Sequence, residues 1–285
     1  MEKIEKLKKI FKREKIDGYI IPKNDEFFGE YVPEYNDRLN FISSFTGSYG
    51  FALVLKDKNY LFVDGRYTLQ ANSQSGGIFK IVTIPDKMPS DILNGKKLSI
   101  GFDPNLFTEK TLFNLFGKNK SKFKPIIWNL IDKIWKRKII KNKDKFYSLP
   151  DRVLGEKHQS KINKISNYLK KKKTDFLFVT AGENNAWLLN IRGRDTNYAP
   201  IPNSYILIDK DQNIKFFCDL KKISSSLKKK FEKVKFLDIR FCAKILREIK
   251  KKKFIIDSST CSFFFKNIIS NDNYIFNLQD PIYLM

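Results

Sequence analysis

The sequence predicts an α/β protein made of two tandem, related three-layer α/β/α domains, each with a mixed sheet covered by helices. Three observations predict this class: apolar residues recur at helical spacing, short apolar runs bounded by polar turns indicate buried strands, and the same succession of segments occurs twice. The chain has 285 residues, of which 42% are hydrophobic, and this is enough for a buried core in each of two domains.

The first repeat opens with an amphipathic helix, because apolar residues three and four positions apart form one stripe at Ile4, Leu7, Ile10 and Phe11. A hairpin follows, since two apolar runs flank the polar turn 56–59. Gly47 and Gly50 bracket the turn that leads into this hairpin. The strands that we expect in this repeat lie at 18–21, 51–55, 60–63 and within 97–103.

The second repeat follows the same order. Its helix has an apolar stripe at Ile162, Ile165 and Leu169, and its hairpin turns at 209–213. The expected strands lie at 176–179, 205–208, 214–217 and within 252–257, and polar loops are expected at 23–26 and 183–185. The break at Ser148-Leu149-Pro150-Asp151 predicts domains at 1–147 and 153–285.

Composition excludes several classes of protein. The formal charge of +24 comes from lysine and accompanies abundant Ile, Asn, Phe and Tyr, as an A+T-rich genome imposes, and no nucleic-acid-binding motif occurs. No apolar run is long enough for a membrane span, and the N-terminus lacks the apolar region of a secretory signal. Three cysteines without CxxC spacing fit a reducing compartment. We therefore expect a cytoplasmic protein that binds no membrane, and we favour other functions over nucleic-acid binding.

Candidate catalytic groups are few. His158 is the only histidine, so a histidine-rich metal site cannot be assembled. A Ser/His/Asp triad would have to use His158, and no GxSxG nucleophile elbow supports one. No phosphate-binding loop occurs. Aspartates recur at strand ends and could in principle build a carboxylate-only metal site, although such aspartates usually cap turns and helices. They are Asp17, Asp64, Asp103, Asp175, Asp219 and Asp257. We predict no catalytic or metal-binding residue in this chain.

Two motifs stand out from this background. One is Asp64-Gly65-Arg66-Tyr67, which follows the first hairpin. The other runs from Trp187 to Asp195 and contains Asn190, Arg192 and Gly193. Arg192 and Asp195 are predicted to form an ion pair, because a guanidinium matches a carboxylate bidentately. An aromatic and arginine cluster on a loop also suits a substrate rim or an interface.

These motifs resemble the N-terminal two domains of Xaa-Pro aminopeptidases, in the creatinase/prolidase superfamily. The resemblance covers nearly the whole chain and implies two ribonuclease-H-like domains that precede a catalytic domain. The residues that carry it are Glu30-Tyr31, Pro33, Arg38-Leu39, Gly47-Ser48-Tyr49-Gly50, Asp64-Gly65-Arg66-Tyr67, Gln70-Ala71, Glu183, Trp187-Leu188-Leu189-Asn190-Ile191-Arg192-Gly193, Asp195, Pro200 and Ser204-Tyr205.

The resemblance implies a function for the complete enzyme. Members remove the N-terminal residue that precedes proline in peptides, and they use two metal ions, typically Mn²⁺, held by two Asp, one His and two Glu of the C-terminal domain. The present sequence reaches Met285 before those positions, so we expect a truncated or frameshifted chain that is inactive alone. The implied partners are the missing catalytic domain, a second copy in the full-length enzyme and proline-containing peptides.

The resemblance also suggests roles for the two motifs. We expect the surfaces around Arg66, Tyr67, Trp187 and Asn190–Asp195 to face the missing domain or the substrate. Gly47, Gly50, Asp64, Gly65 and Gly193 are then structural residues of the motifs. Two alternatives remain: a stand-alone peptide- or protein-binding module with the same fold, and a basic nucleic-acid binder, which would require salt-sensitive affinity.

Overall fold

The computed structural model describes residues 1–117, 119–139 and 142–285. The chain divides into unit 1, Met1–Glu26 with Val32–Ile140, and unit 2, Phe27–Tyr31 with Lys141–Met285. This division differs from the predicted first domain, 1–147, because the end of that segment packs with unit 2. Phe146 is buried in the core of unit 2, and Tyr147 exchanges main-chain hydrogen bonds with Arg192.

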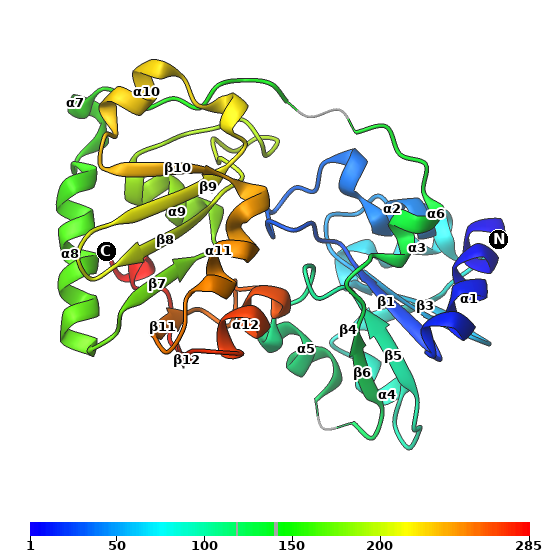
Figure 1. The fold of residues 1–285 in the computed structure, drawn as a ribbon. Coiled ribbons are helices and arrows are strands. Elements are labelled where there is room, and N and C mark those ends of the chain that lie inside the picture. The colour runs from blue at the N-terminus through cyan, green and yellow to red at the C-terminus, as the bar shows by residue number, and fades with distance from the viewer. Residues whose placement is uncertain (118, 140–141) are drawn as a thin grey trace. The chain divides into compact units, whose positions relative to one another are not determined.

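Unit 1 contains a six-stranded mixed sheet in the order β4-β3-β2-β1-β5-β6 (Figure 1). Its strands are β1 (Gly18–Pro22), β2 (Phe51–Leu55), β3 (Asn59–Asp64), β4 (Lys80–Ile84), β5 (Ser99–Phe102) and β6 (Lys122–Pro125). Its helices are α1 (Glu2–Glu14), α2 (Arg38–Ser43), α3 (Thr68–Ser75), α4 (Pro89–Ile92), α5 (Glu109–Phe116) and α6 (Leu130–Ile134), with 3-10 turns at Glu34–Asn36 (η1) and Gly65–Tyr67 (η2).

The hairpin of β2 and β3 forms as the sequence predicts, with Phe51 opposite Phe62 in an antiparallel pair. Strand β1 pairs antiparallel with β2 and parallel with β5, and the outer pairs β3–β4 and β5–β6 are parallel. Helix α1 buries Ile4, Leu7 and Phe11 against this sheet, as the predicted stripe requires.

Unit 2 repeats the sheet in the order β10-β9-β8-β7-β11-β12. Its strands are β7 (Phe176–Val179), β8 (Tyr205–Asp209), β9 (Ile214–Cys218), β10 (Val234–Asp238), β11 (Lys253–Ile256) and β12 (Tyr274–Asn277). Its helices are α7 (Asp151–Leu154), α8 (His158–Lys172), α9 (Gly182–Leu189), α10 (Ser225–Lys230), α11 (Cys242–Glu248) and α12 (Phe263–Ser270), with 3-10 turns at Leu220–Lys222 (η3), Ile239–Phe241 (η4) and Pro281–Leu284 (η5).

Alternate residues of these strands serve two cores, one on each face of the sheet. Leu177 and Val179 of β7 pack with α8 and α9, whereas Phe178 between them packs with α11 and α12. This is the consequence of the two-residue period of a strand. The predicted fold class, two related α/β domains with mixed sheets covered by helices, is confirmed.

One predicted loop is corrected by the structure. Residues 183–185 lie in the first turns of α9, where Asn184 and Asn185 are buried. The amide of Asn184 donates to Asp280, and that of Asn185 donates to the Ser204 carbonyl, each at 2.8 Å. Their polarity therefore reflects internal hydrogen bonding and not exposure to solvent.

Candidate functional site

The Asp64-Gly65-Arg66-Tyr67 motif forms the corner between β3 and α3. Asp64 caps the 3-10 turn η2 by accepting a hydrogen bond from the Arg66 main-chain N–H at 2.9 Å. The same carboxylate accepts from Arg66 Nη2 at 2.7 Å and from Arg66 Nε at 3.2 Å. The motif is therefore a local turn closed by a forked ion pair.

The corner faces solvent. The Arg66 side chain is 75% exposed, and its guanidinium lies 5.4 Å from the centre of the Tyr67 ring. The Tyr67 hydroxyl hydrogen-bonds with Ser48 Oγ at 2.7 Å. The hydrogen bond from Arg66 holds the pKa of Asp64 below its ordinary value, so this carboxylate stays ionised at neutral pH and cannot act as a general acid. The arginine is free to contact a partner, but the corner has no catalytic chemistry of its own.

The glycines of the two motifs differ in whether the neighbouring atoms leave room for a side chain. A Cβ at Gly50 would lie 2.8 Å from a main-chain oxygen of β3, and one at Gly193 would lie 2.8 Å from a main-chain carbon of the facing segment. At Gly47 a Cβ would meet the buried ring of Phe45. A Cβ at Gly65 would meet no atom within 4 Å. Close packing therefore requires glycine at positions 47, 50 and 193 but not at position 65.

The second motif begins at the C-terminal end of α9, where Asn190 adopts a left-handed conformation with φ of 54°. Asn190 is 2% exposed, and its amide donates to the Glu156 carbonyl at 2.9 Å. Its side-chain oxygen accepts a hydrogen bond from Lys161 Nζ at 2.7 Å. Lys161 Nζ also donates to the Trp187 carbonyl at 2.7 Å and lies 3.8 Å from the centre of the Trp187 ring.

Lys161 is the residue that joins this network, and the sequence analysis did not single it out. It is itself 2% exposed, and burial lowers its pKa. Its ammonium group is stabilised by carbonyl oxygens and an aromatic face. In a chain with long runs of lysine, no sequence signal distinguishes this lysine from the exposed ones.

The predicted ion pair between Arg192 and Asp195 is wrong. Arg192 Nη1 donates instead to the Ala186 carbonyl at 2.6 Å, because the main-chain pairing of Arg192 with Tyr147 turns its side chain back toward α9. Asp195 pairs with Lys222, and each of these two side chains is 7% exposed. Residues three apart in sequence thus serve two separate contacts.

This geometry also corrects the predicted interface. Asn190 and Asp195 point into unit 2 and bond there, so neither side chain is exposed on the surface of unit 2. Trp187 is partly buried against the same core, and Arg192 is half-buried. Of the predicted interface residues, Arg66 and Tyr67 belong to an exposed corner, and Arg194 within the second motif is 70% exposed.

Each unit also buries an aspartate near the carboxyl ends of its central parallel strands. Asp103 follows β5 and accepts from Asn129 Nδ2 at 2.8 Å, and Asp280 accepts from Asn184 Nδ2 at 2.8 Å. Burial raises the pKa of both aspartates to about 6. Asp257, which follows β11, accepts from the main-chain N–H of Asp280 at 2.9 Å. The strand-end aspartates therefore bond within their own units.

The donor set does not fit a metal centre. Within 1–117, 119–139 and 142–285, no group of three or more His, Cys, Asp or Glu side chains is arranged to hold a metal ion. His158, the first residue of α8, lies against the ring of Phe231 with 4.8 Å between ring centres. Over the same residues, none of the helices combines the length and the apolar character that a membrane crossing requires.

The chain is similar in sequence to known proteins that are longer, and the similarity covers part of each of them. It is 31% identical to a probable Xaa-Pro aminopeptidase P of Coprinopsis cinerea over 74% of this chain and 35% of the relative. It is 28% identical to a probable Xaa-Pro aminopeptidase P of Pyrenophora teres over 98% of this chain and 46% of the relative. The chain thus spans less than half the length of these relatives, and it is homologous to their N-terminal part.

The fold has a solved counterpart, and both units match one family. An X-prolyl aminopeptidase of Caenorhabditis elegans, described as a cytosolic enzyme with a di-nuclear active site, aligns with a TM-score of 0.87 at 25% identity. The alignment covers 98% of this chain and 50% of that enzyme. Models of the Creatinase/Prolidase N-terminal domain match residues 3–130 and, separately, residues 137–285. The chain therefore belongs to the creatinase/prolidase N-terminal domain family, which it represents twice in tandem.

Proposed function

We propose that the two units are the non-catalytic N-terminal domains of an Xaa-Pro aminopeptidase, which removes the residue preceding proline from the N-terminus of peptides. The observation that carries the proposal is the alignment of 98% of this chain with half of the nematode enzyme. The tandem match of both units to one N-terminal domain family supports it. In this proposal the units stabilise and orient a catalytic domain and perform no hydrolysis.

The metal chemistry of such an enzyme is assigned to residues outside these units. A dinuclear site, with Mn²⁺ as the expected ion, needs several carboxylate and imidazole ligands around one cavity, and no such group exists among the described residues. We further propose that the longer protein is a homodimer of the cytoplasm. Three free, buried cysteines agree with a reducing compartment.

A peptidase assay on the purified 285-residue chain tests the proposal. We expect no cleavage of a fluorogenic Xaa-Pro peptide, with or without added Mn²⁺, and no stoichiometric Mn²⁺ binding by titration calorimetry. A chimaera of this chain with the C-terminal portion of the Pyrenophora teres relative should cleave the same peptide. Turnover by the isolated chain would overturn the proposal.

A further inference from the structure

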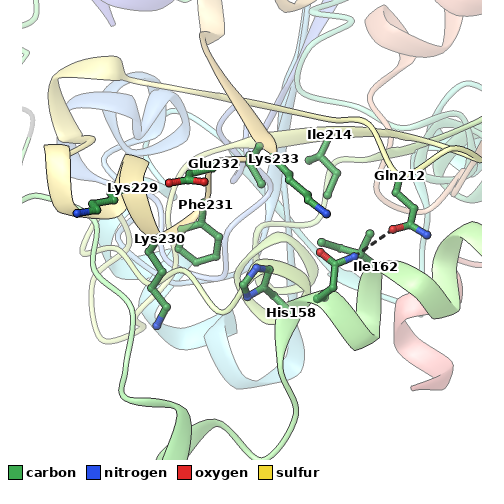
Figure 2. A pocket seen from close by; sticks show the side chains of 11 residues that line it. His158, Ile162, Gln212, Ile214, Lys229, Lys230, Phe231, Glu232 and Lys233 are labelled. Carbon is green, nitrogen blue, oxygen red and sulfur yellow. Dashed lines mark hydrogen bonds between the residues drawn. The ribbon is translucent and has the colours of Figure 1, made fainter.

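Unit 2 contains a cavity of about 240 Å³ beside the start of α8. Its walls come from three places: the first turn of α8, the turn between β8 and β9, and the segment 229–234 that leads into β10 (Figure 2). Ligand sites commonly measure roughly 300–1,000 Å³, so this cavity suits a small molecule. It is unrelated to either sequence motif.

One wall of the cavity is apolar. Ile162, Ile214 and Phe231 are each at most 3% exposed, and the ring of His158 lies against that of Phe231. These groups belong to or border the core of unit 2, so their positions are fixed by packing. An apolar or aromatic group could therefore bind against this wall without rearrangement of the fold.

The rim of the cavity is cationic. Lys229, Lys230 and Lys233 line it with only one acidic residue, Glu232. In Figure 2 the Lys233 ammonium and the Glu232 carboxylate point in opposite directions. Within the described ranges no carboxylate lies within 4 Å of Lys233 Nζ, whereas Lys56 and Lys210, which each follow a strand, pair with an aspartate. An uncompensated ammonium group at a concave rim attracts anions.

An amide donor lies on the same rim. Gln159 Nε2 donates to Gln212 Oε1 at 3.0 Å, which orients the Gln212 amide and leaves its N–H groups without a partner in the described residues. The Gln212 main chain is held in a left-handed conformation with φ of 71° at the tip of the β8–β9 turn. Asp209 closes this turn by accepting from the main-chain N–H groups of Asp211 and Asn213, each at 2.9 Å. The donor is therefore positioned before any ligand arrives.

We propose that this cavity binds a small organic anion. Its carboxylate or phosphate group lies between Lys233 and the Gln212 amide, and its apolar part packs against Phe231 and Ile162. A cation and an oriented amide give the charge-assisted hydrogen bonds that such groups prefer. The limited volume restricts the apolar part to about one ring.

Titration calorimetry of the whole chain with four probes tests this site. Phenyl phosphate and benzoate distinguish the two anionic groups, inorganic phosphate tests the anion alone, and benzyl alcohol tests the apolar wall alone. We expect one of the two aromatic anions to bind at a single site with higher affinity than inorganic phosphate or benzyl alcohol. Equal affinity for benzyl alcohol, or no binding of either aromatic anion at about 10 mM, would overturn the proposal.

Two substitutions locate the site. Lys233→Gln removes the ammonium group and should weaken anion binding about tenfold, whereas Lys235→Gln, which removes the same charge from an exposed position outside the cavity, should not change it. Gln212→Glu places a carboxylate at the rim and should abolish binding. Equal weakening by the substitutions at 233 and 235 would mean that net charge alone attracts the probes, and would refute a defined site.

Discussion

Units 1 and 2 each use an aspartate to join the two central parallel strands of the sheet by a hydrogen bond. In unit 1 the carboxylate of Asp17, just before β1, accepts from the main-chain N–H of Ser99 at 2.9 Å and so joins β1 to β5. In unit 2 Asp175, just before β7, accepts from the main-chain N–H of Lys253 at 3.0 Å and joins β7 to β11. The duplicated sheet order thus extends to individual hydrogen bonds.

The same units differ in where their signature motifs place polar groups. The Arg66 side chain of unit 1 is 75% exposed and bonds only within its own corner. In unit 2 Asn190 is 2% exposed and Asp195 bonds with a buried lysine. The two motifs stand out equally in the sequence, yet the motif of unit 1 lies on the surface and the motif of unit 2 bonds inside the fold.

The largest expected effect follows from breaking the buried pair of unit 2. Asp195→Ala leaves Lys222 buried without its counter-ion, so we expect the free energy of unfolding to fall by about 3–5 kcal/mol. Urea denaturation followed by circular dichroism measures this loss. Asp64 in the motif of unit 1 pairs with an arginine that is 75% exposed, so Asp64→Ala is the matched control and should cost much less. Equal losses from the two substitutions would contradict the contrast between the motifs.

The buried acids predict a pH dependence shared by both units. The pKa of Asp103 and of Asp280 is raised by burial to about 6, above the unfolded value of about 4. Each folded carboxyl therefore favours its proton, and its contribution to stability is complete below pH of about 4 and is lost as pH rises through about 6. The loss is on the order of 3 kcal/mol for each group.

Unfolding free energies measured from pH 4 to pH 7 test this dependence. Asp280→Asn replaces the carboxyl by a neutral group that retains an acceptor oxygen for Asn184, so the pH slope should become shallower. Asp103→Asn should have a similar effect in unit 1. A variant that keeps the slope of the parent chain would show that folding does not raise the pKa of its aspartate.

A smaller loss is expected when the helix end of α9 is altered. Asn190→Ala removes its bonds to Lys161 and to the Glu156 carbonyl and places alanine in a left-handed conformation, so we expect a loss of about 2 kcal/mol. Ser44 ends α2 of unit 1 in the same conformation, with φ of 66°, but is exposed. Ser44→Ala is thus the matched control for conformation alone. Denaturation curves that show equal losses would exclude a role for the buried network.

Sequence patterns predicted the parts of the fold that depend on local periodicity. The expected strand 176–179 coincides with β7, and the helix predicted from Ile162, Ile165 and Leu169 is α8. The edge strands of both sheets, β4, β6, β10 and β12, were not predicted, because they are partly or largely exposed and lack the apolar run of a central strand. A continuous apolar run indicates a strand that is buried on both faces, and these strands are not.

The candidate site was less predictable than the fold. The partners of Asn190 and Asp195 are Lys161 and Lys222, which lie 29 and 27 residues away in sequence. Each partner is one of 55 lysines and arginines, so spacing alone cannot select it. Arg192 was paired with its nearest acidic neighbour, whereas the main-chain bridge to Tyr147 decides its direction. Contacts between common residue types that are far apart in sequence cannot be predicted from the local sequence pattern.

The smallest effect on stability, and the one that separates folding from function, is expected at Arg66. Its guanidinium contacts only Asp64 and the Tyr67 ring, both in its own corner, so Arg66→Ala should leave the urea midpoint of the chain unchanged within error. If the corner faces a catalytic domain, as the resemblance of its motif to the family implies, the same substitution should reduce Xaa-Pro cleavage by the chimaera with the Pyrenophora teres C-terminal portion. Arg240→Ala is the control, because Arg240 forms the same forked pair with Asp238 in unit 2 and is 82% exposed. Equal activity of the two variants would show that Arg66 does not contribute to such an interface. A loss of activity confined to Arg66→Ala would show that the exposed motif of unit 1 recognises the catalytic domain, whereas the motif of unit 2 stabilises its own fold.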